Sequence, residues 1–381
     1  MTLESYLQFG INARRHLHEY PELGREEFKT TAYCQEVMIS LGYKVTPCFA
    51  TGFYADLHIS DDLPTIAFRA DMDALPALEK AGEVVCSKHD GVAHLCGHDM
   101  HMAVSLTAAK IMVEHRDSLK ANVRFLFQPS EEMFRGGAKG MIDEGCLDGV
   151  DFVYGQHNDP QIDCGQIAIR DGVMSSNGDQ FLIRLTGKSA HATVPHLGLD
   201  AISESVRLLN QFKAIITDKV DPNKAALIST CMIRAGEAPN ILAPYAELEG
   251  SVRSFDPAVQ ATLLAHFNDE LETSRRRGFG VELEMKGYPA IVNHKAEVAK
   301  AVAAASAILG EENVLLTYPP MVGSEDFSYF TLEKPGAFFF LGSGNHAKGH
   351  NAPIHSNPII INEDAILVGA RIFAALAGVT I

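Results

Sequence analysis

Short apolar runs that alternate with helical stretches constrain the fold of this chain most. The runs cover residues 65–69, 123–127 and 152–154. A helical pattern at residues 101–115 separates the first two, and this alternation is typical of a largely parallel sheet covered by helices. Polar residues follow each run at 71–73, 128–132 and 156–157. Because functional side chains collect at the carboxyl ends of such strands, we expect these three groups to meet.

From about residue 175 the pattern changes to strand, helix, strand, strand, helix, strand. The six segments are residues 180–186, 199–216, 226–235, 245–253, 257–275 and 281–286. This order is that of the ferredoxin-like split unit. The alternation of helices and strands then resumes, and 381 residues exceed one compact core. We therefore predict an α/β protein with a discontinuous outer domain, residues 1–174 and 288–381, and an inserted α+β domain, residues 175–287.

Charge, hydropathy and cysteine usage exclude several classes of partner. The formal charge is −16, and no Lys/Arg cluster offers a stripe for nucleic acid. No stretch approaches the ~18 apolar residues of a membrane span, and no secretory signal is visible. The seven cysteines are widely spaced and show no disulfide framework. We expect a cytoplasmic protein that binds neither nucleic acid nor membrane.

Five side chains are candidate metal ligands, and they come from separate parts of the chain. They are Cys96, His98, Glu132, His157 and His355. Cys96 and His98 lie two residues apart in a loop before a helix, so both could face one cation. The mixture of thiolate, imidazole and carboxylate suits zinc, manganese, cobalt or nickel rather than calcium or magnesium. Five ligands exceed the needs of one tetrahedral ion, so we expect two ions that share a bridging ligand.

Each of these residues taken singly has an ordinary explanation. A lone histidine is more often structural, and a pair such as Glu131-Glu132 is usually solvated charge. Their shared placement after strands favours a metal site instead. One glutamate can then bind metal, while its neighbour has a pKa raised by the first charge and lowered by the cation. Such a group can take a proton from water and deliver it to a leaving amine.

Five motifs, in one order along the chain, resemble the M20 family of metallopeptidases. They are residues 69–76 (Arg-Ala-Asp-Met-Asp-Ala-Leu-Pro), 96–99 (Cys-Gly-His-Asp), 127–132 (Phe-Gln-Pro-Ser-Glu-Glu), 191–196 (His-Ala-Thr-Val-Pro-His) and 323–329 (Gly-Ser-Glu-Asp-Phe-Ser-Tyr). Within that family they resemble the amidohydrolase branch. The branch contains hippurate hydrolases, N-acyl-amino-acid aminoacylases, auxin-conjugate hydrolases and N-acetyldiaminopimelate deacetylases. The similarity covers nearly the whole chain.

The resemblance implies a phosphorylase/hydrolase-like mixed-sheet catalytic domain with a ferredoxin-like lid that also serves dimerisation. It makes the five candidates the ligands of two divalent metal ions (Mn²⁺, Zn²⁺, Co²⁺ or Ni²⁺), with Cys96 as the bridge. Glu131 becomes the general base. Asp71 and Asp73 occupy the strand end of the active site, where they are expected to orient ligands.

Further roles in the lid and around the ligands also follow from the resemblance. His191 is similar to the lid histidine that stabilises the oxyanion, often from a partner subunit. Asn240 and Arg253 resemble the lid residues that hold the substrate carboxylate. Asp99 and His101 are candidates for supporting the ligands from behind.

The expected function is hydrolysis of N-acyl-L-amino acids by metal-activated water, as in hippurate hydrolases and aminoacylases. We expect a small-molecule substrate and a homodimer or higher oligomer formed through the lid. One alternative is an N-acetyldiaminopimelate deacetylase of lysine biosynthesis, whose extra charged groups would suit the polar pair Asn158-Asp159. An inactive binding protein on the same scaffold is a second alternative, but it would require a missing ligand or base, and none is missing.

Overall fold

The computed structural model describes residues 2–82, 84–133 and 136–381. It divides into two compact units. The first contains Met1–Met174, Val292–Pro319 and Asp326–Ile381, and the second contains Ser175–Ile291 and Pro320–Glu325. The expected class is confirmed: a mixed α/β unit is interrupted by an inserted α+β unit.

Two short segments belong to a different unit from the one the sequence predicts. Residues 288–291 and 320–325 were expected in the outer domain, but they pack with the inserted unit. Hydrogen bonds tie both segments to the first residues of the inserted unit. Ala290 N donates to Asn177 Oδ1 at 2.9 Å, and Ser176 N donates to the Met321 carbonyl at 2.9 Å. Such pairings between distant segments leave no periodic pattern in the sequence, which is why the division differs from the predicted one at these positions.

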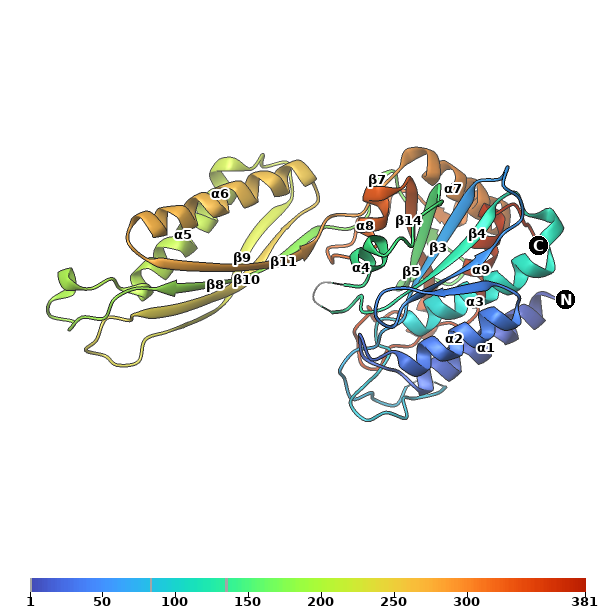
Figure 1. Ribbon diagram of the computed structural model, residues 1–381, viewed down its shortest axis with the longest axis horizontal. Helices are drawn as coiled ribbons and strands as arrows, with labels where there is room; N and C mark the ends of the chain where they lie inside the picture. The colour runs from blue at the N-terminus through green and yellow to red at the C-terminus, as the bar shows by residue number, and fades with distance from the viewer. Residues whose placement is uncertain (1, 83, 134–135) are drawn as a thin grey trace. The chain divides into compact units, whose positions relative to one another are not determined.

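The first unit is built on an eight-stranded sheet in the order β1-β2-β4-β3-β5-β14-β6-β13. The strands are β1 (Lys44–Pro47), β2 (Phe53–Leu57), β3 (Thr65–Asp71), β4 (Asn122–Gln128), β5 (Phe152–Asp163), β6 (Ile167–Ala168), β13 (Val314–Leu315) and β14 (Gly336–Gly344). A separate small ladder pairs β7 (Gly172–Val173) with β12 (Val292–Asn293). The four central strands β4, β3, β5 and β14 are parallel, whereas β1, β2 and β4 pair antiparallel. The sheet is therefore mixed, and its parallel centre brings several strand ends to one edge (Figure 1).

Helices cover this sheet, and α3 is the most enclosed of them. The helices are α1 (Leu3–Glu19), α2 (Phe28–Ser40), α3 (His98–Glu114), α4 (Ala138–Asp143), α7 (Lys295–Leu309), α8 (Ser328–Glu333) and α9 (Ala365–Leu376). Helix α3 is buried along most of its length because α1, α2, α9 and the sheet surround it. Across the described parts of the chain, no helix combines the length and apolarity needed to cross a bilayer.

Strand β5 is longer than the apolar run at residues 152–154 predicts. It continues to Asp163, so His157 lies within the strand rather than after it. The reason is its partner: the fully buried β14 pairs in parallel with β5 from Val153 to Asp159 and supplies backbone partners beyond the apolar run.

The second unit has the order strand, helix, strand, strand, helix, strand. Its elements are β8 (Asn177–Thr186), α5 (Ala201–Lys219), β9 (Ala226–Ala235), β10 (Tyr245–Ser254), α6 (Pro257–Arg276) and β11 (Gly280–Tyr288). The antiparallel sheet has the order β11-β8-β10-β9, and both helices lie on one face (Figure 1). Asp200 and Asp256 cap the two helices by accepting hydrogen bonds from first-turn N–H groups. Stacked Phe212 and Phe267, with ring centroids 4.4 Å apart, lie in the core between helices and sheet.

Candidate metal centre

The loop that carries Cys96 and His98 turns sharply at Gly97. Gly97 has φ +95°, and a Cβ there would lie 2.1 Å from Asn158 Oδ1. Only glycine combines that backbone conformation with so close an approach. The turn ends in α3, whose first residue is His98, so the Cys96 and His98 side chains both reach the strand ends.

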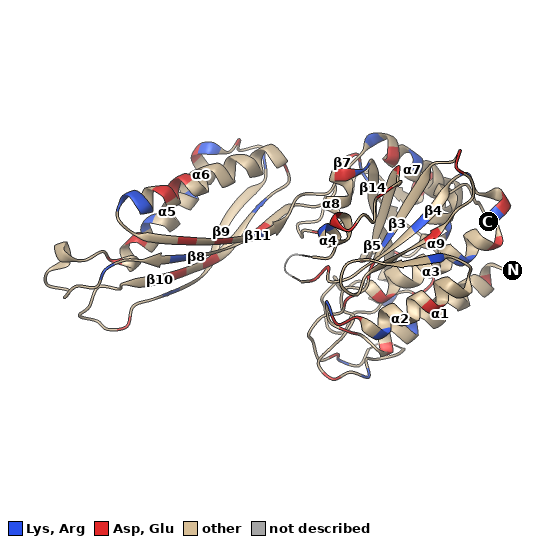
Figure 2. Ribbon diagram, in the orientation of Figure 1, with Lys and Arg blue, Asp and Glu red and all other residues tan. Residues whose placement is uncertain are grey.

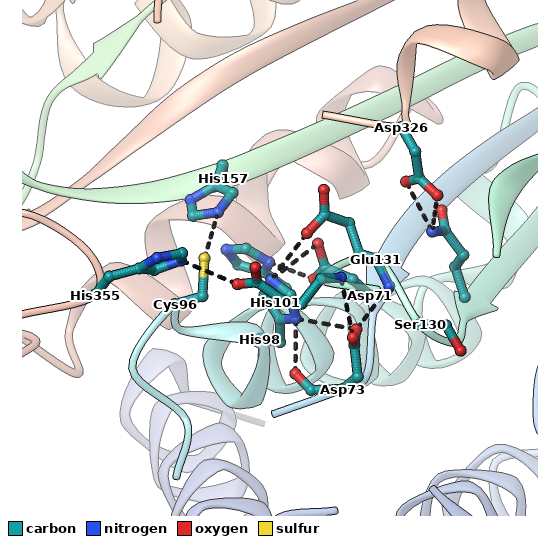
Figure 3. Close-up of polar contacts among 12 residues, drawn as sticks. Asp71, Asp73, Cys96, His98, His101, Ser130, Glu131, His157, Asp326 and His355 are labelled. Carbon is teal, nitrogen blue, oxygen red and sulfur yellow. Dashed lines mark hydrogen bonds and ion pairs between the residues drawn. The ribbon is translucent and has the colours of Figure 1, made fainter. Parts of the chain in front are cut away.

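All five predicted ligands converge together with Glu131. The ligand atoms lie within 4.8 Å of one another in three groups: Cys96, His98 and His157; Cys96, Glu132 and His355; and His98, Glu131 and Glu132. Cys96 Sγ lies 3.3 Å from His157 Nε2, and His355 Nε2 lies 3.0 Å from Glu132 Oε1. Figure 3 shows these side chains pointing toward one another from separate elements. Cys96, His98 and Glu132 each belong to two of these groups, so these three side chains link the groups into one cluster.

Hydrogen bonds to the backbone set which nitrogen each buried imidazole presents. His98 Nδ1 donates to the Asp73 carbonyl at 2.8 Å, and His157 Nδ1 donates to the Asn158 carbonyl at 2.8 Å. In the neutral rings, both Nε2 atoms are thereby left as acceptors facing the cluster. His98 Nε2 is buried without a hydrogen-bond partner among the described residues and lies 3.5 Å from Asp71 Oδ2. Because a buried polar atom without a hydrogen bond is costly, this atom fits a cation, and the sulfur, nitrogen and oxygen donors suit a divalent transition metal.

Asp71 and His101 lie against the ligands but have their polar atoms occupied. Asp71 Oδ2 accepts from Arg69 Nη1 at 2.5 Å, and Asp71 Oδ1 accepts from His101 Nδ1 at 2.5 Å. The Asn158 N–H donates to His101 Nε2 at 3.0 Å. Burial alone would raise the pKa of Asp71, but Arg69, His101 and His98 hold it well below its ordinary value. Both residues therefore support the ligands rather than offer themselves as ligands.

Asp73 clamps the loop that carries the paired glutamates. Its Oδ1 accepts from Glu131 N at 2.9 Å, and its Oδ2 accepts from Glu132 N at 3.0 Å. The preceding Ser130 has φ +62°, and its N–H donates to Glu27 Oε1 at 2.8 Å. Carboxylates on two other segments thus hold three consecutive N–H groups, which fixes the directions in which Glu131 and Glu132 point.

Several acidic groups lie close together in this cluster, and they shift the pKa values of the neighbouring thiol and imidazole. Burial and the neighbouring Glu132 and Glu131 raise the pKa of the Cys96 thiol well above its ordinary value. Burial lowers the pKa of His98, yet Asp71 and other nearby carboxylates raise it to about 10. The side chains by themselves thus bind protons tightly. A divalent cation among them favours the thiolate and the neutral imidazole instead, so metal and protons compete for the same atoms.

Sequence reasoning missed a buried ion pair behind the site. Arg69 lies in β3 and donates to Asp326 Oδ1 at 3.0 Å through Nη2. Gln128 Nε2 also donates to Asp326 Oδ1, at 2.8 Å. Arg69 interrupts an apolar run in the sequence. This pattern predicts a buried ion pair, because a buried guanidinium requires an anion. Glu27, in contrast, follows no recognisable pattern in the sequence.

The two members of the polar pair Asn158-Asp159 differ in their surroundings. The Asn158 side chain is 1% exposed and lies against Gly97. Asp159 accepts hydrogen bonds from Gln161 N at 2.8 Å and from the Tyr318 hydroxyl at 2.9 Å. Asp159 is thus engaged within the chain, whereas the Asn158 side-chain Oδ1 and Nδ2 have no hydrogen-bond partner among the described residues.

His191 and Asn240 lie on adjacent segments of the second unit. His191 forms a β-bridge with Ile241, and Ala192 N donates to the Asn240 carbonyl at 3.0 Å. His191 Nδ1 lies 2.8 Å from Thr193 Oγ1, and Thr193 N donates to the same nitrogen at 3.3 Å. The His191 side chain is exposed, so its Nε2 is open to an external partner.

Arg253 lies far from this pair within the same unit. It opposes Gly178 at the start of β8, and its Nη1 donates to the Val322 carbonyl at 3.1 Å. The end of β8 near Asn240 is eight residues further on, or about 26 Å. One copy of this unit therefore cannot present Asn240 and Arg253 to the same carboxylate.

Comparisons with known proteins agree with this geometry. Residues 67–378 match the model of peptidase family M20/M25/M40. The chain is 37% identical over 371 residues to the N-acetyl-L-cysteine deacetylase of Bacillus subtilis, covering 96% of this chain and 86% of that protein. It is 35% identical over 377 residues to thermostable carboxypeptidase 1 of Saccharolobus solfataricus, covering 96% of this chain and 94% of that protein.

A solved structure extends the match to three dimensions. The YXEP protein of Bacillus subtilis, described as a dinuclear metal-binding peptidase of the M20 family, superposes with a TM-score of 0.84 at 28% identity. The match covers 98% of each chain. The family model spans most of this sequence, and the deacetylase match exceeds a third in identity over nearly the whole length. The chain therefore belongs to peptidase family M20/M25/M40, a family of enzymes that hydrolyse amide bonds.

Proposed function

We propose that this enzyme is a metal-dependent amidohydrolase that cleaves N-acyl-L-amino acids. The observation that carries the proposal is the convergence of one thiol, three imidazoles and a carboxylate beside the further carboxylate of Glu131. Two divalent ions would be held by Cys96, His98, Glu132, His157 and His355, with Cys96 between them. The ions, when bound, supply Lewis-acid polarisation of the scissile carbonyl and lower the pKa of a water molecule.

Glu131 is the group placed to move protons in this reaction. Its backbone N–H is held by Asp73, so its carboxylate enters the cluster from a fixed direction. Glu131 takes a proton from water and then gives it to the leaving amine nitrogen. His191 donates from Nε2 to the developing oxyanion.

The substrate class is inferred from what two relatives have in common. N-acetylcysteine and the last residue of a peptide each contribute an amide nitrogen that belongs to an amino acid with a free carboxylate. An enzyme for either bond needs a cationic or amide donor for that carboxylate, and Arg253 and Asn240 are our candidates for this role.

A homodimer would explain how Arg253 and Asn240 act on one substrate. Because about 26 Å of strand β8 separates the position of Arg253 from the strand end near Asn240, we propose that one comes from a partner copy together with His191. Strand β9 is an edge strand and carries exposed Leu227 and Ile233, which favours pairing with a second copy.

A substrate panel tests the proposed function directly. The metal-loaded protein should hydrolyse N-acetyl- and N-benzoyl-L-amino acids, with release of the free amine measured by ninhydrin or mass spectrometry. Chelation should abolish turnover, and Mn²⁺ or Zn²⁺ should restore it. Activity on dipeptides but on no N-acyl amino acid, or a rate insensitive to chelation, would refute the proposal.

A further inference from the structure

Two buried cysteines outside the metal centre meet at one backbone carbonyl. Cys48 Sγ donates to the Met141 carbonyl oxygen at 3.5 Å, and Cys146 N donates to the same oxygen at 3.0 Å. The two thiols also interact with each other through a hydrogen bond. Cys48 is 5% exposed and Cys146 is fully buried. Residues almost a hundred positions apart in the sequence therefore place two sulfurs side by side.

The turn that carries Cys48 packs against α4, the helix that leads to Cys146. Phe49 N donates to Glu144 Oε2 at 2.6 Å, just after α4 ends. A Cβ at Gly140 would lie 2.4 Å from the Phe49 ring, so turn and helix are in direct contact. Phe49 has a positive φ of 39°. This packing holds the two cysteines at a fixed separation.

The same turn is connected to the loop that carries Glu131. Thr51 Oγ1 donates to Glu27 Oε2 at 2.5 Å, and Glu27 Oε1 accepts from Ser130 N at 2.8 Å. Ser130 directly precedes Glu131. A covalent bond at Cys48 would therefore restrain a turn that helps to hold the catalytic loop.

We propose that Cys48 and Cys146 form a peroxide-sensitive thiol pair that closes to an intramolecular disulfide. The Cys48 thiolate attacks hydrogen peroxide, which gives a sulfenic acid and hydroxide. The Cys146 thiol then attacks the sulfenic sulfur, forming the S–S bond and releasing water. In total, two thiols lose two protons and two electrons, and one peroxide becomes two waters. Peroxide is a small oxidant, and Cys48 is the member of the pair that retains some exposure.

The surroundings indicate which sulfur reacts first. The hydrogen bond from Cys146 lowers the pKa of Cys48, whereas that hydrogen bond and burial raise the pKa of Cys146. Arg124 favours ionisation of both thiols, and its Nη1 donates to the Cys146 carbonyl at 2.8 Å. Cys48 is thus the first to ionise, and Cys146 is the resolving thiol.

The test uses the metal-loaded protein in a background in which exposed Cys86 and Cys231 are replaced by serine. Stoichiometric peroxide should lower the intact mass by about 2 Da, the two hydrogens lost on disulfide formation. Peptide mapping without reduction should give a Cys48–Cys146 cross-link. The melting temperature should rise by about 5 °C, because the bond closes a long loop, and dithiothreitol should reverse the rise.

Two single variants and one control complete the test. Cys48→Ser and Cys146→Ser should each abolish the cross-link and the thermal shift, whereas Cys34→Ser, at a buried cysteine without a thiol neighbour in the described structure, should leave both intact. Stable sulfinic acid at Cys48 in the background protein, or a cross-link to another cysteine, would overturn the proposal. If one serine variant is unstable, the cross-link map of the background protein still decides the question.

Discussion

Glu204 in the second unit and Glu132 in the first have different kinds of partner. In the second unit Glu204 is 1% exposed, and its oxygens accept from Arg207 Nε at 2.7 Å, Ser274 Oγ at 2.7 Å and Arg277 Nε at 2.9 Å. Figure 2 shows the basic and acidic residues interspersed along α5 and α6. In the first unit, Glu132 at the metal centre instead pairs with His355 at 3.0 Å and lies beside the Cys96 thiol.

The Glu204 cluster is a structural charge cluster, whereas the charges of the metal centre are arranged to bind an external ion. The Glu204 cluster contains its own guanidinium groups, so it is complete without any external ion. The carboxylates and thiol of the metal centre meet imidazoles, which carry charge only when protonated. Behind the centre, Arg69 satisfies Asp71 and Asp326. Arg69 thus balances the charge of the carboxylates behind the centre. The candidate ligands, in contrast, need a metal ion to balance theirs.

Replacement of Glu131 should have the largest effect. Glu131→Gln keeps the size of the side chain but removes the proton acceptor, so kcat should fall about 10³-fold. Bound metal, measured by inductively coupled plasma mass spectrometry, should remain at the level of the unchanged enzyme. Glu132→Gln is the matched control and should lose metal as well as activity. Parallel loss of metal in Glu131→Gln would reverse the two assignments.

Removal of the Asp73 clamp should weaken metal binding without removing a ligand. Asp73→Asn keeps one acceptor oxygen but cannot accept from both Glu131 N and Glu132 N, so metal affinity should fall about 10- to 100-fold. Competition with a metal-binding dye measures this change. An affinity equal to that of the unchanged protein would mean that the loop is held without Asp73.

Breaking the cluster in the second unit should affect stability and leave the metal centre intact. Glu204→Gln removes the anion that Arg207 and Arg277 share, leaves Arg207 paired only with Glu270, and should lower the free energy of unfolding by about 2 kcal/mol. Glu272 pairs with Arg275 at the surface of the same unit, so Glu272→Gln should cost under about 0.5 kcal/mol. Urea denaturation measures both. Loss of metal in Glu204→Gln would contradict the separation of the two clusters.

Acid should affect the two clusters at different pH values. Burial raises the pKa of Glu204, but Ser274 and Arg207 lower it below its ordinary 4.5. Its contribution to stability is therefore complete above about pH 4.5 and is lost as the pH falls through the lowered value. Metal should leave earlier, below about pH 6, because thiolate and imidazole ligands must be deprotonated. Metal content and unfolding, followed in one pH titration, should change in that order.

Local patterns in the sequence predicted much of the fold. The six segments of the inserted unit follow the expected order because alternating and helical periodicities report which side of each element is buried. The caps Asp200 and Asp256 mark helix starts in the same local manner. Two of the candidate ligands, Glu132 and His157, also carry a local signal, since they follow short apolar runs.

Other features depend on register and on contacts between distant segments. His101 and Asp71 lie as close to the cluster as the ligands do, but their partners Asn158 and Arg69 occupy their polar atoms. Nothing in the sequence around Asn158 indicates that its side chain is buried against Gly97. The distance between Arg253 and Asn240 likewise follows from the pairing of β10 with β8.

The sequence by itself determined the elements, their order and the chemical kinds of residue available at the strand ends. Only the tertiary structure decided which of those residues can offer an atom to a metal ion and which hold the candidate ligands in place through hydrogen bonds. The physical reason is that periodicity records burial along one element, whereas a hydrogen bond between two segments depends on strand order and register, which involve the whole chain.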